Sequence, residues 1–269
     1  MKPLFLSLPC LLFSIFTFAQ KHSGQPFTIG ETISFHSDVL NEQRLLNIYL
    51  PNNYNSNDTI EYDVIYLLDG SVDEDFIHIA GIVQFANFEW INLIPKSIVV
   101  GIENVDRQRD FTYPTSVKED KDHFTTSGGS AQFMNFVEKE VQTMINQKYR
   151  VNNMKTLIGQ SLGGLMATEF LMKKPDLFDN YIIISPSLWW DNESLLKAEP
   201  KITDNIKAIY IGVGKEGEVM ERVAKELHDK IDRSEKKNAK LMFQFFEKHD
   251  HGDVLHQAVY DAFEKIYKP

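Results

Sequence analysis

The stretch Gly159-Gln160-Ser161-Leu162-Gly163 decides the fold, because its small residues surround one serine at a predicted junction between strand and helix. Residues 154–158 before it lean apolar and predict a short strand, and the apolar residues 165–172 after it predict a buried helix. A serine in that context is typical of a nucleophile elbow, a turn so tight that only small residues fit two places on either side. The elbow would hold the Ser161 hydroxyl above the sheet edge and aim the Leu162 N–H at a developing oxyanion. The alternative is a glycine-rich turn in which the serine has no chemical role.

Apolar runs bounded by turn residues recur along the chain and alternate with segments of helical spacing. A loosely alternating run predicts an early strand over 45–50, and continuous apolar runs predict buried strands at 64–68, 97–102, 181–184, 208–211 and 241–246. Helical spacing predicts helices over 131–147, 219–231 and 254–266. This alternation predicts an α/β fold, with a mostly parallel sheet covered by helices on both faces.

Length and charge limit the domain count and the partners. The chain has 269 residues, 43% of them hydrophobic, and a formal net charge of −10. This length suits one large domain, and no repeat or linker divides it, so residues 20–269 are predicted to form a single catalytic domain. An acidic chain without a basic cluster argues against nucleic acid and anionic membrane surfaces as partners.

The first 19 residues predict a signal peptide. Lys2 precedes a nearly continuous apolar run over 4–18, and cleavage is expected before Gln20. The run is short for a membrane span and no later stretch approaches one, so a secreted or periplasmic protein is expected. Cys10, the only cysteine in the sequence, lies within this segment, so the mature chain is expected to lack disulfides and thiolate ligands.

A serine hydroxyl becomes a nucleophile only when a base takes its proton, and the base needs an acid to orient it. In the α/β-hydrolase plan these three groups follow strands in the order serine, acid, histidine. His251, directly after the last predicted strand, is the expected base, with His249 as the alternative. The acid should follow the strand at 208–211, which makes Glu216 the first candidate and Glu218 the second.

A second oxyanion donor is expected from the loop after the strand at 64–68. The backbone N–H groups of Gly70 or Ser71 occupy that position. An ordinary turn at a strand end would have the same residue types.

Several motifs beyond the elbow resemble the esterase family of α/β hydrolases, in particular its branch of trilactone siderophore esterases. The family also includes feruloyl and acetyl-xylan esterases, S-formylglutathione hydrolases and mycolyltransferases. The resemblance spans roughly residues 62–253 and rests on Leu67-Leu68-Asp69-Gly70, Arg107-Gln108-Arg109-Asp110-Phe111-Thr112, Gly159 to Gly164, Ser185-Pro186-Ser187-Leu188-Trp189-Trp190-Asp191, and His251-Gly252. The elbow is common to many families, whereas the stretch with two tryptophans is much more specific.

This resemblance implies that Ser161 is the nucleophile and His251 the base. It implies that Trp189 and Trp190 line a substrate pocket, and that Arg109, like Arg107, lies near its mouth. Core packing for the tryptophans and surface ion pairs for the arginines remain open as alternatives.

Other classes fit the sequence less well. The run Gly212 to Gly217 matches a dinucleotide fingerprint, but too little chain follows it for a nucleotide-binding domain. The histidines and aspartates at 249–253 could suggest a metal, but no other ligand type clusters with them. A silent hydrolase fold that binds a ligand, or an acyltransferase, would share every residue named.

The sequence therefore predicts a serine hydrolase that cleaves carboxylic esters of small molecules through an acyl-enzyme. No metal and no organic cofactor are expected to take part. Siderophore trilactones and plant cell-wall feruloyl or acetyl esters both remain open as substrates.

Overall fold

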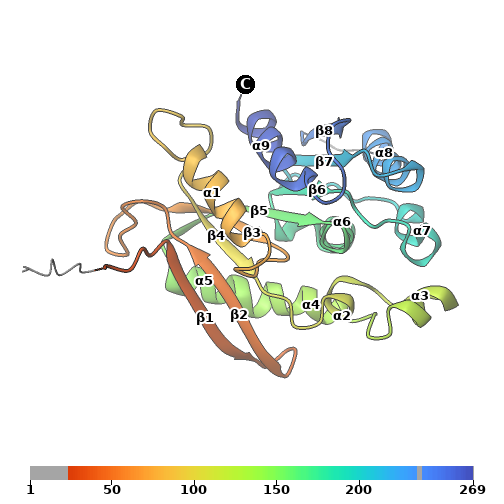
Figure 1. Ribbon diagram of the computed structural model, residues 1–269, viewed down its shortest axis with the longest axis horizontal. Coiled ribbons are helices and arrows are strands. Elements are labelled where there is room, and N and C mark those ends of the chain that lie inside the picture. The colour runs from red at the N-terminus through yellow and green to blue at the C-terminus, as the bar shows by residue number, and fades with distance from the viewer. Residues whose placement is uncertain (1–23, 235–237, 269) are drawn as a thin grey trace, which may run out of the picture.

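A computed structural model describes residues 24–234 and 238–268, and within them eight strands form one sheet (Figure 1). Their order across the sheet is β1-β2-β4-β3-β5-β6-β7-β8. The strands are β1 (Gly30–Ser37), β2 (Glu42–Tyr49), β3 (Tyr62–Leu67), β4 (Ser97–Ile102), β5 (Val151–Gln160), β6 (Asn180–Ile184), β7 (Ala208–Gly214) and β8 (Lys240–Phe246).

The sheet is antiparallel at one end and parallel elsewhere. β2 pairs antiparallel with both β1 and β4, and every neighbour pair from β4 to β8 is parallel. Parallel strands end at the same edge, so the loops after β3, β4, β5, β7 and β8 meet there. Ligands of open α/β sheets bind outside this carboxyl edge.

Helices cover both faces of the sheet, as predicted (Figure 1). α1 and α9 pack on one face, while α4, α5, α6 and α8 pack on the other. The helical segments are α1 (Phe76–Ala86), α2 (Arg107–Phe111), α3 (Lys118–His123), α4 (Ser130–Phe136), the π-helical turn η1 (Val137–Val141), α5 (Gln142–Lys148), α6 (Leu162–Lys173), the short η2 (Pro175–Leu177), α7 (Trp190–Lys197), α8 (Glu218–Arg233) and α9 (Val254–Tyr267).

The core follows from the two-residue period of the strands. In β6, Tyr181 and Ile183 face the side of α6 and α8, while Ile182 and Ile184 face α1 and α9. All four side chains are fully buried. The continuous apolar runs of the sequence are therefore strands buried on both faces, which confirms the predicted α/β architecture.

The predicted central strands and the last two helices are present, with small shifts at their ends. The helix predicted over 131–147 is instead two α-helices joined by the π-helical turn η1. β1 and α1 escaped sequence-based prediction, because β1 is an edge strand with much of its surface exposed, and α1 carries β-branched residues and Gly81 that weaken a helical pattern. The signal peptide predicted at 1–19 lies outside the described residues.

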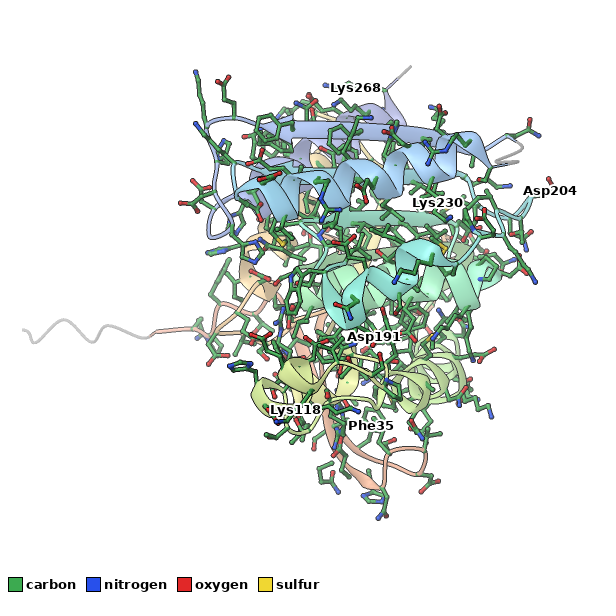
Figure 2. The ribbon with its side chains drawn as sticks, turned by 90° about the vertical axis from the view of Figure 1, so that its right-hand side faces the viewer. Phe35, Lys118, Asp191, Asp204, Lys230 and Lys268 are labelled. Carbon is green, nitrogen blue, oxygen red and sulfur yellow. The ribbon has the colours of Figure 1, made fainter. Side chains whose placement is uncertain are left out.

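The helices α3 and α7 meet beyond the carboxyl edge of the sheet. Asp191, near the start of α7, faces the α3 segment that carries Lys118 (Figure 2). Its carboxylate accepts hydrogen bonds from the Ser116 backbone at 2.6 Å and the Thr115 hydroxyl at 3.0 Å. Burial raises the pKa of Asp191 somewhat, but these hydrogen bonds outweigh it and lower the pKa to about 2. The charged carboxylate thus ties the two loops together.

Candidate active site

Ser161 sits at the junction of β5 and α6 in a conformation that the surrounding glycines make accessible. Its φ of 61° and ψ of −120° lie in a region that residues with a side chain rarely adopt. A Cβ on Gly159 would lie 2.3 Å from the Gly163 carbonyl oxygen, and one on Gly164 would lie 2.7 Å from the Ile184 carbonyl oxygen. Only glycine fits at both positions. The sharp turn at Ser161 therefore explains why glycines surround the serine in the sequence.

The backbone of β6 and of the loop after it holds this turn. Ser161 N–H donates to the Ile184 carbonyl at 3.1 Å, and the Ser161 carbonyl accepts from Ser187 N–H at 3.0 Å. The Oγ atoms of Ser161 and Ser187 lie 3.5 Å apart. The strained serine is therefore anchored on both of its backbone polar groups, and its hydroxyl projects into a cleft.

His251 and Glu216 form a hydrogen-bonded pair beside the serine. The distance between His251 Nδ1 and Glu216 Oε2 is 2.5 Å, and the glutamate side chain is only 2% exposed. The other carboxylate oxygen accepts from the Ser185 hydroxyl and from Gly214 N–H. Burial pushes the pKa of Glu216 upward, but these hydrogen bonds outweigh it and hold the pKa below its usual value. Glu216 is thus an anion with fixed partners.

The same bond sets the basicity of the histidine. The hydrogen bond to Glu216 is the largest influence on His251 and, against the opposing effect of burial, raises the pKa of its imidazole. Because Nδ1 faces the carboxylate, Nε2 is the nitrogen left to exchange a proton with a group in the cleft. Gln160, next to the serine, donates from Nε2 to the His251 carbonyl at 2.7 Å and so ties the histidine loop to the elbow.

The two alternatives for base and acid occupy other places. His249 turns its ring toward Phe246, and its Nδ1 lies 3.4 Å from Asp253 Oδ2. Glu218 is the exposed first residue of α8. Neither residue lines the cleft with Ser161.

The expected oxyanion donors differ in whether their N–H groups already donate to another backbone group in the structure. Leu162 is the first residue of α6, where an N–H has no partner within the helix. Gly70 N–H donates to the Ile102 carbonyl at 3.0 Å, so its proposed role is wrong. Ser71 follows it in the loop after β3, and none of the backbone hydrogen bonds recorded among the described residues uses its N–H. Leu162 and Ser71 therefore remain the candidate pair of donors.

The cleft around the serine has a volume of about 410 Å³. It is lined by Asp69, Glu74, Asp75, Arg107, Gln160, Ser161 and His251. Arg107 Nε and Nη2 donate to the two oxygens of Asp69 at 2.6 and 2.9 Å. Arg107 therefore lies at this cleft, as the resemblance to the esterase family implies. The resemblance implies the same position for Arg109.

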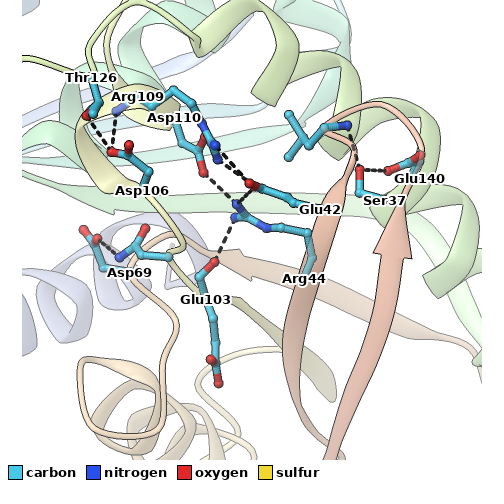
Figure 3. Close-up of polar contacts among 12 residues, drawn as sticks. Ser37, Glu42, Arg44, Asp69, Glu103, Asp106, Arg109, Asp110, Thr126 and Glu140 are labelled. Carbon is cyan, nitrogen blue, oxygen red and sulfur yellow. Dashed lines mark hydrogen bonds and ion pairs between the residues drawn. The ribbon is translucent and has the colours of Figure 1, made fainter.

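Arg109 does not reach this cleft, and the expectation that it binds substrate is wrong. Its guanidinium pairs with Glu42 at 2.6 Å and with Asp110 at 2.8 Å (Figure 3). Asp110 also pairs at 2.7 Å with Arg44 of β2, which is fully buried. The arginine belongs to a network of ion pairs that fastens α2 to the first hairpin. Arg107, two residues earlier in the chain, lines the cleft instead and pairs with Asp69.

The tryptophans are also structural, contrary to the expected pocket role. Trp190 is fully buried, and its indole N–H donates to the Tyr113 carbonyl at 2.9 Å. Trp189 packs against the core beside Phe124, with ring centroids 5.9 Å apart, and does not line the cleft. Both rings pack in or against the core because burial of so much apolar surface is strongly stabilising.

Residues 185–191, the stretch of sequence most specific to the family, hold the residues of the site in position. Ser185 holds Glu216, Pro186 packs against Gly164 and Ser187 bonds to the backbone of Ser161. Trp190 and Asp191 then fasten α7 to the neighbouring loops. This stretch therefore contributes to the site by positioning Ser161 and Glu216.

Sequence reasoning missed Glu74 and Asp75 as cleft residues, and Ser185 and Gln160 as positioning residues. An acidic run directly after β3, at the carboxyl edge of the sheet, is a signal that could have identified the first two. Within the described residues, no group of three or more histidine, cysteine, aspartate or glutamate side chains is arranged to hold a metal ion.

An elbow serine directly after β5, a histidine after β8 and an acid after β7, on a sheet of this strand order, define an α/β hydrolase. The family model described as "Putative esterase" matches residues 37–260, so the chain belongs to this esterase family.

Individual relatives agree with this assignment. The chain is 32% identical over 187 residues to the ferri-bacillibactin esterase BesA of Bacillus subtilis, and the match covers 65% of each protein. An IroE-like serine hydrolase from Shewanella oneidensis superposes with a TM-score of 0.78 at 28% identity, over 89% of this chain and 80% of that one. The BES protein of Bacillus cereus shares the fold with a TM-score of 0.79 at 24% identity, over 93% and 98% of the two chains.

Proposed function

We propose that this protein is a serine esterase that cleaves carboxylic esters through an acyl-serine intermediate. The observation that carries the proposal is the 2.5 Å contact between His251 and the buried Glu216, in the same cleft as the strained Ser161. A buried acid that holds one imidazole nitrogen leaves the other free to serve as a base.

The residues suggest a two-step reaction. Ser161 Oγ attacks the ester carbonyl carbon while His251 Nε2 accepts the hydroxyl proton, and Glu216 stabilises the imidazolium that forms. The N–H groups of Leu162 and Ser71 bind the oxyanion of the tetrahedral intermediate. The imidazolium returns its proton to the leaving alcohol, and water, activated by the same histidine, then hydrolyses the acyl-serine.

For the substrate we propose the ester bonds of a siderophore lactone. One relative is named a ferri-bacillibactin esterase, and the enterobactin esterase of Emericella nidulans is 42% identical over 72 residues, although that match covers only 24% of the fungal protein. The cleft opens at the carboxyl edge of the sheet and is large enough to admit one ester arm of such a molecule.

We propose that the protein is exported and acts outside the cytoplasm. Residues 1–19 have the charge and apolar pattern of a signal peptide. None of the helices in residues 24–234 and 238–268 is long and apolar enough to span a membrane. Fractionation of cells that express the full chain, with sequencing of the mature N-terminus, tests this proposal; a cytoplasmic protein that keeps Lys2 would contradict it.

A fluorophosphonate probe tests the enzyme class, since it reacts with an activated serine and needs no knowledge of the substrate. We expect the protein to be labelled, and Ser161→Ala to lose labelling while its circular dichroism stays unchanged. Ser127→Ala, on a loop away from the cleft, is the matched control and should label normally. Labelling that persists in Ser161→Ala would exclude Ser161 as the nucleophile, and a folded protein that never labels would contradict an esterase.

A further inference from the structure

The cleft beside Ser161 carries an excess of negative charge. Three of its lining residues are carboxylates, Asp69, Glu74 and Asp75, and one is a guanidinium, Arg107. The catalytic histidine is the remaining titratable group. A small cleft lined by one sign of charge concentrates its field on whatever enters it.

The single arginine does not offset this excess, because Asp69 already neutralises it. Both oxygens of the aspartate accept hydrogen bonds from Arg107, at 2.6 and 2.9 Å, and Asp69 is only 7% exposed. A bidentate pair of this kind acts on a ligand as a near-neutral unit. Glu74 and Asp75 are therefore left as the uncompensated charges of the cleft.

Asp75 has no structural duty that would occupy its carboxylate. It stands at the N-cap position of α1, but its side chain makes no capping hydrogen bond. Among the described residues, none of the recorded hydrogen bonds or ion pairs uses its side chain. Burial, together with the charges of Asp69 and Glu74, raises the pKa of Asp75 to about 6. Burial is the larger cause of this shift, but the contribution of Asp69 and Glu74 reflects negative charge around Asp75 that also disfavours other anions at the same place.

Glu74 lies next to it on the rim. Its two carboxylate oxygens receive only long contacts from Asn104 Nδ2, at 3.3 and 3.5 Å, and the side chain is exposed. It is free to meet an incoming group that carries charge.

We propose that Glu74 and Asp75 make this active site select esters whose acyl or alcohol part is neutral or cationic over anionic esters. The inference rests on the proposed esterase function and specifies the substrate of that same site.

A series of three matched 4-nitrophenyl esters tests the selection. Their acyl chains end in a tert-butyl, a trimethylammonium or a sulfonate group, so shape is similar and charge differs. We expect the wild type to have the lowest kcat/KM for the sulfonate. Replacing one carboxylate, in Glu74→Gln or Asp75→Asn, should raise the ratio of kcat/KM for sulfonate over tert-butyl ester by about three- to tenfold, as expected for unit charges a few ångströms apart that are screened by solvent water.

The matched control removes the same charge at a distance. Glu61→Gln changes an exposed glutamate just before β3, at the end of that strand opposite the cleft. The separation of roughly 20 Å along the strand exceeds the screening length of about 8 Å in physiological salt. This variant should keep the wild-type ratio, and added salt should reduce the selectivity of the wild type.

The pH dependence of the ratio isolates Asp75. Its neighbours in the fold are Asp69, Glu74 and Arg107 around the cleft, and His78 on α1, which itself contacts His256 on α9. As the pH falls through about 6, Asp75 takes up a proton and the bias against the sulfonate ester should weaken. Asp75→Asn should lack this change. Titration of His251 acts on all three esters alike and cancels in the ratio.

The outcomes separate the inference from the proposed function. Hydrolysis of none of the three esters would overturn the esterase itself. Hydrolysis of all three with equal kcat/KM, or a ratio that stays unchanged in both Glu74→Gln and Asp75→Asn, would overturn the charge selection while the esterase stands. A ratio that rises equally in Glu61→Gln would assign the effect to overall charge and would likewise overturn the role of the rim carboxylates.

Discussion

At the scale of the residue, we expect the contact between Glu216 and His251 to set the pH range in which Ser161 acts as the proposed nucleophile. The hydrogen bond that His251 donates to Glu216 raises the pKa of the imidazole, and only the neutral imidazole can accept the serine proton. kcat/KM should therefore fall as the pH drops through a pKa above the ordinary value of histidine. In Glu216→Gln the largest cause of the raised pKa is gone, so this acid limb should move to lower pH. The plateau should fall by roughly 10²–10⁴-fold, because the imidazolium loses its counter-charge.

Glu218→Gln is the matched control for this change, since it neutralises the second candidate acid two residues away. It should keep both the plateau and the acid limb of the wild type. The measurement is the pH profile of kcat/KM for a neutral ester. If Glu218→Gln and Glu216→Gln gave the same profile, the acid would not be Glu216.

The residues of the site show what a sequence can indicate about side-chain direction. That Ser161, Glu216 and His251 come together was predictable because each follows a strand of a parallel sheet, and strand ends converge at one edge. Trp190 and Arg109 were misassigned because proximity along the chain does not determine which way a side chain points. Arg107 and Arg109, two residues apart, take different directions, one to Asp69 and the other to Glu42.

At the scale of the element, the contact of α6 with the end of β6 depends on Gly164. A Cβ there would lie 2.7 Å from the Ile184 carbonyl oxygen and 2.9 Å from Pro186 Cα, both backbone atoms that cannot move aside. We expect Gly164→Ala to lower the free energy of unfolding by roughly 1–3 kcal/mol or more, as overpacking does. Gly81→Ala in α1 is the control, because a Cβ there meets no atom within 4 Å. It should gain about 0.5–1 kcal/mol from better helix propensity. Urea unfolding measures both, and equal effects would contradict the steric reading.

The ion pairs of Figure 3 fasten α2 to the hairpin of β1 and β2. Arg44 is fully buried, and its partners include Asp110, which is itself 1% exposed. Asp110→Asn removes the charge of one partner and leaves a buried guanidinium poorly compensated, so we expect a loss of roughly 3–5 kcal/mol. Asp122→Asn breaks the exposed pair with Lys118 in α3 and should cost about 0–1 kcal/mol. Thermal unfolding at constant pH compares the two, and a small loss in Asp110→Asn would show that Glu42 alone suffices.

An element could be predicted when its own residue pattern shows what stabilises it, and not when distant residues stabilise it. β3, β4 and β6 are buried on both faces, so their apolar runs are continuous and easy to identify. β1 has one neighbour and an exposed surface. The short α2 makes ion pairs with distant residues of β2, and the short α3 accepts a hydrogen bond from the distant Asp191 N–H. Those partners are invisible in a local window of sequence.

At the scale of the whole molecule, the order of the strands was beyond the sequence, although their parallel character was not. Alternation of strands and helices favours a parallel sheet, but nothing in the chain indicates that β4 lies between β2 and β3. That exchange places the loops after β3 and β5 side by side, because β3 and β5 are neighbours. The acidic rim and the serine thus meet through the topology of the sheet.

The first and last helices of the fold, α1 and α9, lie side by side on one face of the sheet (Figure 1). His256 Nε2 and His78 Nδ1 lie 2.7 Å apart between them, so one imidazole must be neutral to accept the shared proton. Burial and the neighbouring His78 lower the pKa of His256 in the folded state. The unfolded chain therefore binds a proton more readily, and stability that is fully present above the ordinary histidine pKa of about 6.5 is lost as the pH falls below it. His256→Gln should flatten this part of the profile of unfolding free energy against pH, whereas His36→Gln, on the exposed edge strand β1, should retain the wild-type slope. Urea unfolding at a series of pH values measures the slope for both variants. An unchanged slope in His256→Gln would mean that protonation of this histidine pair does not affect the stability of the fold.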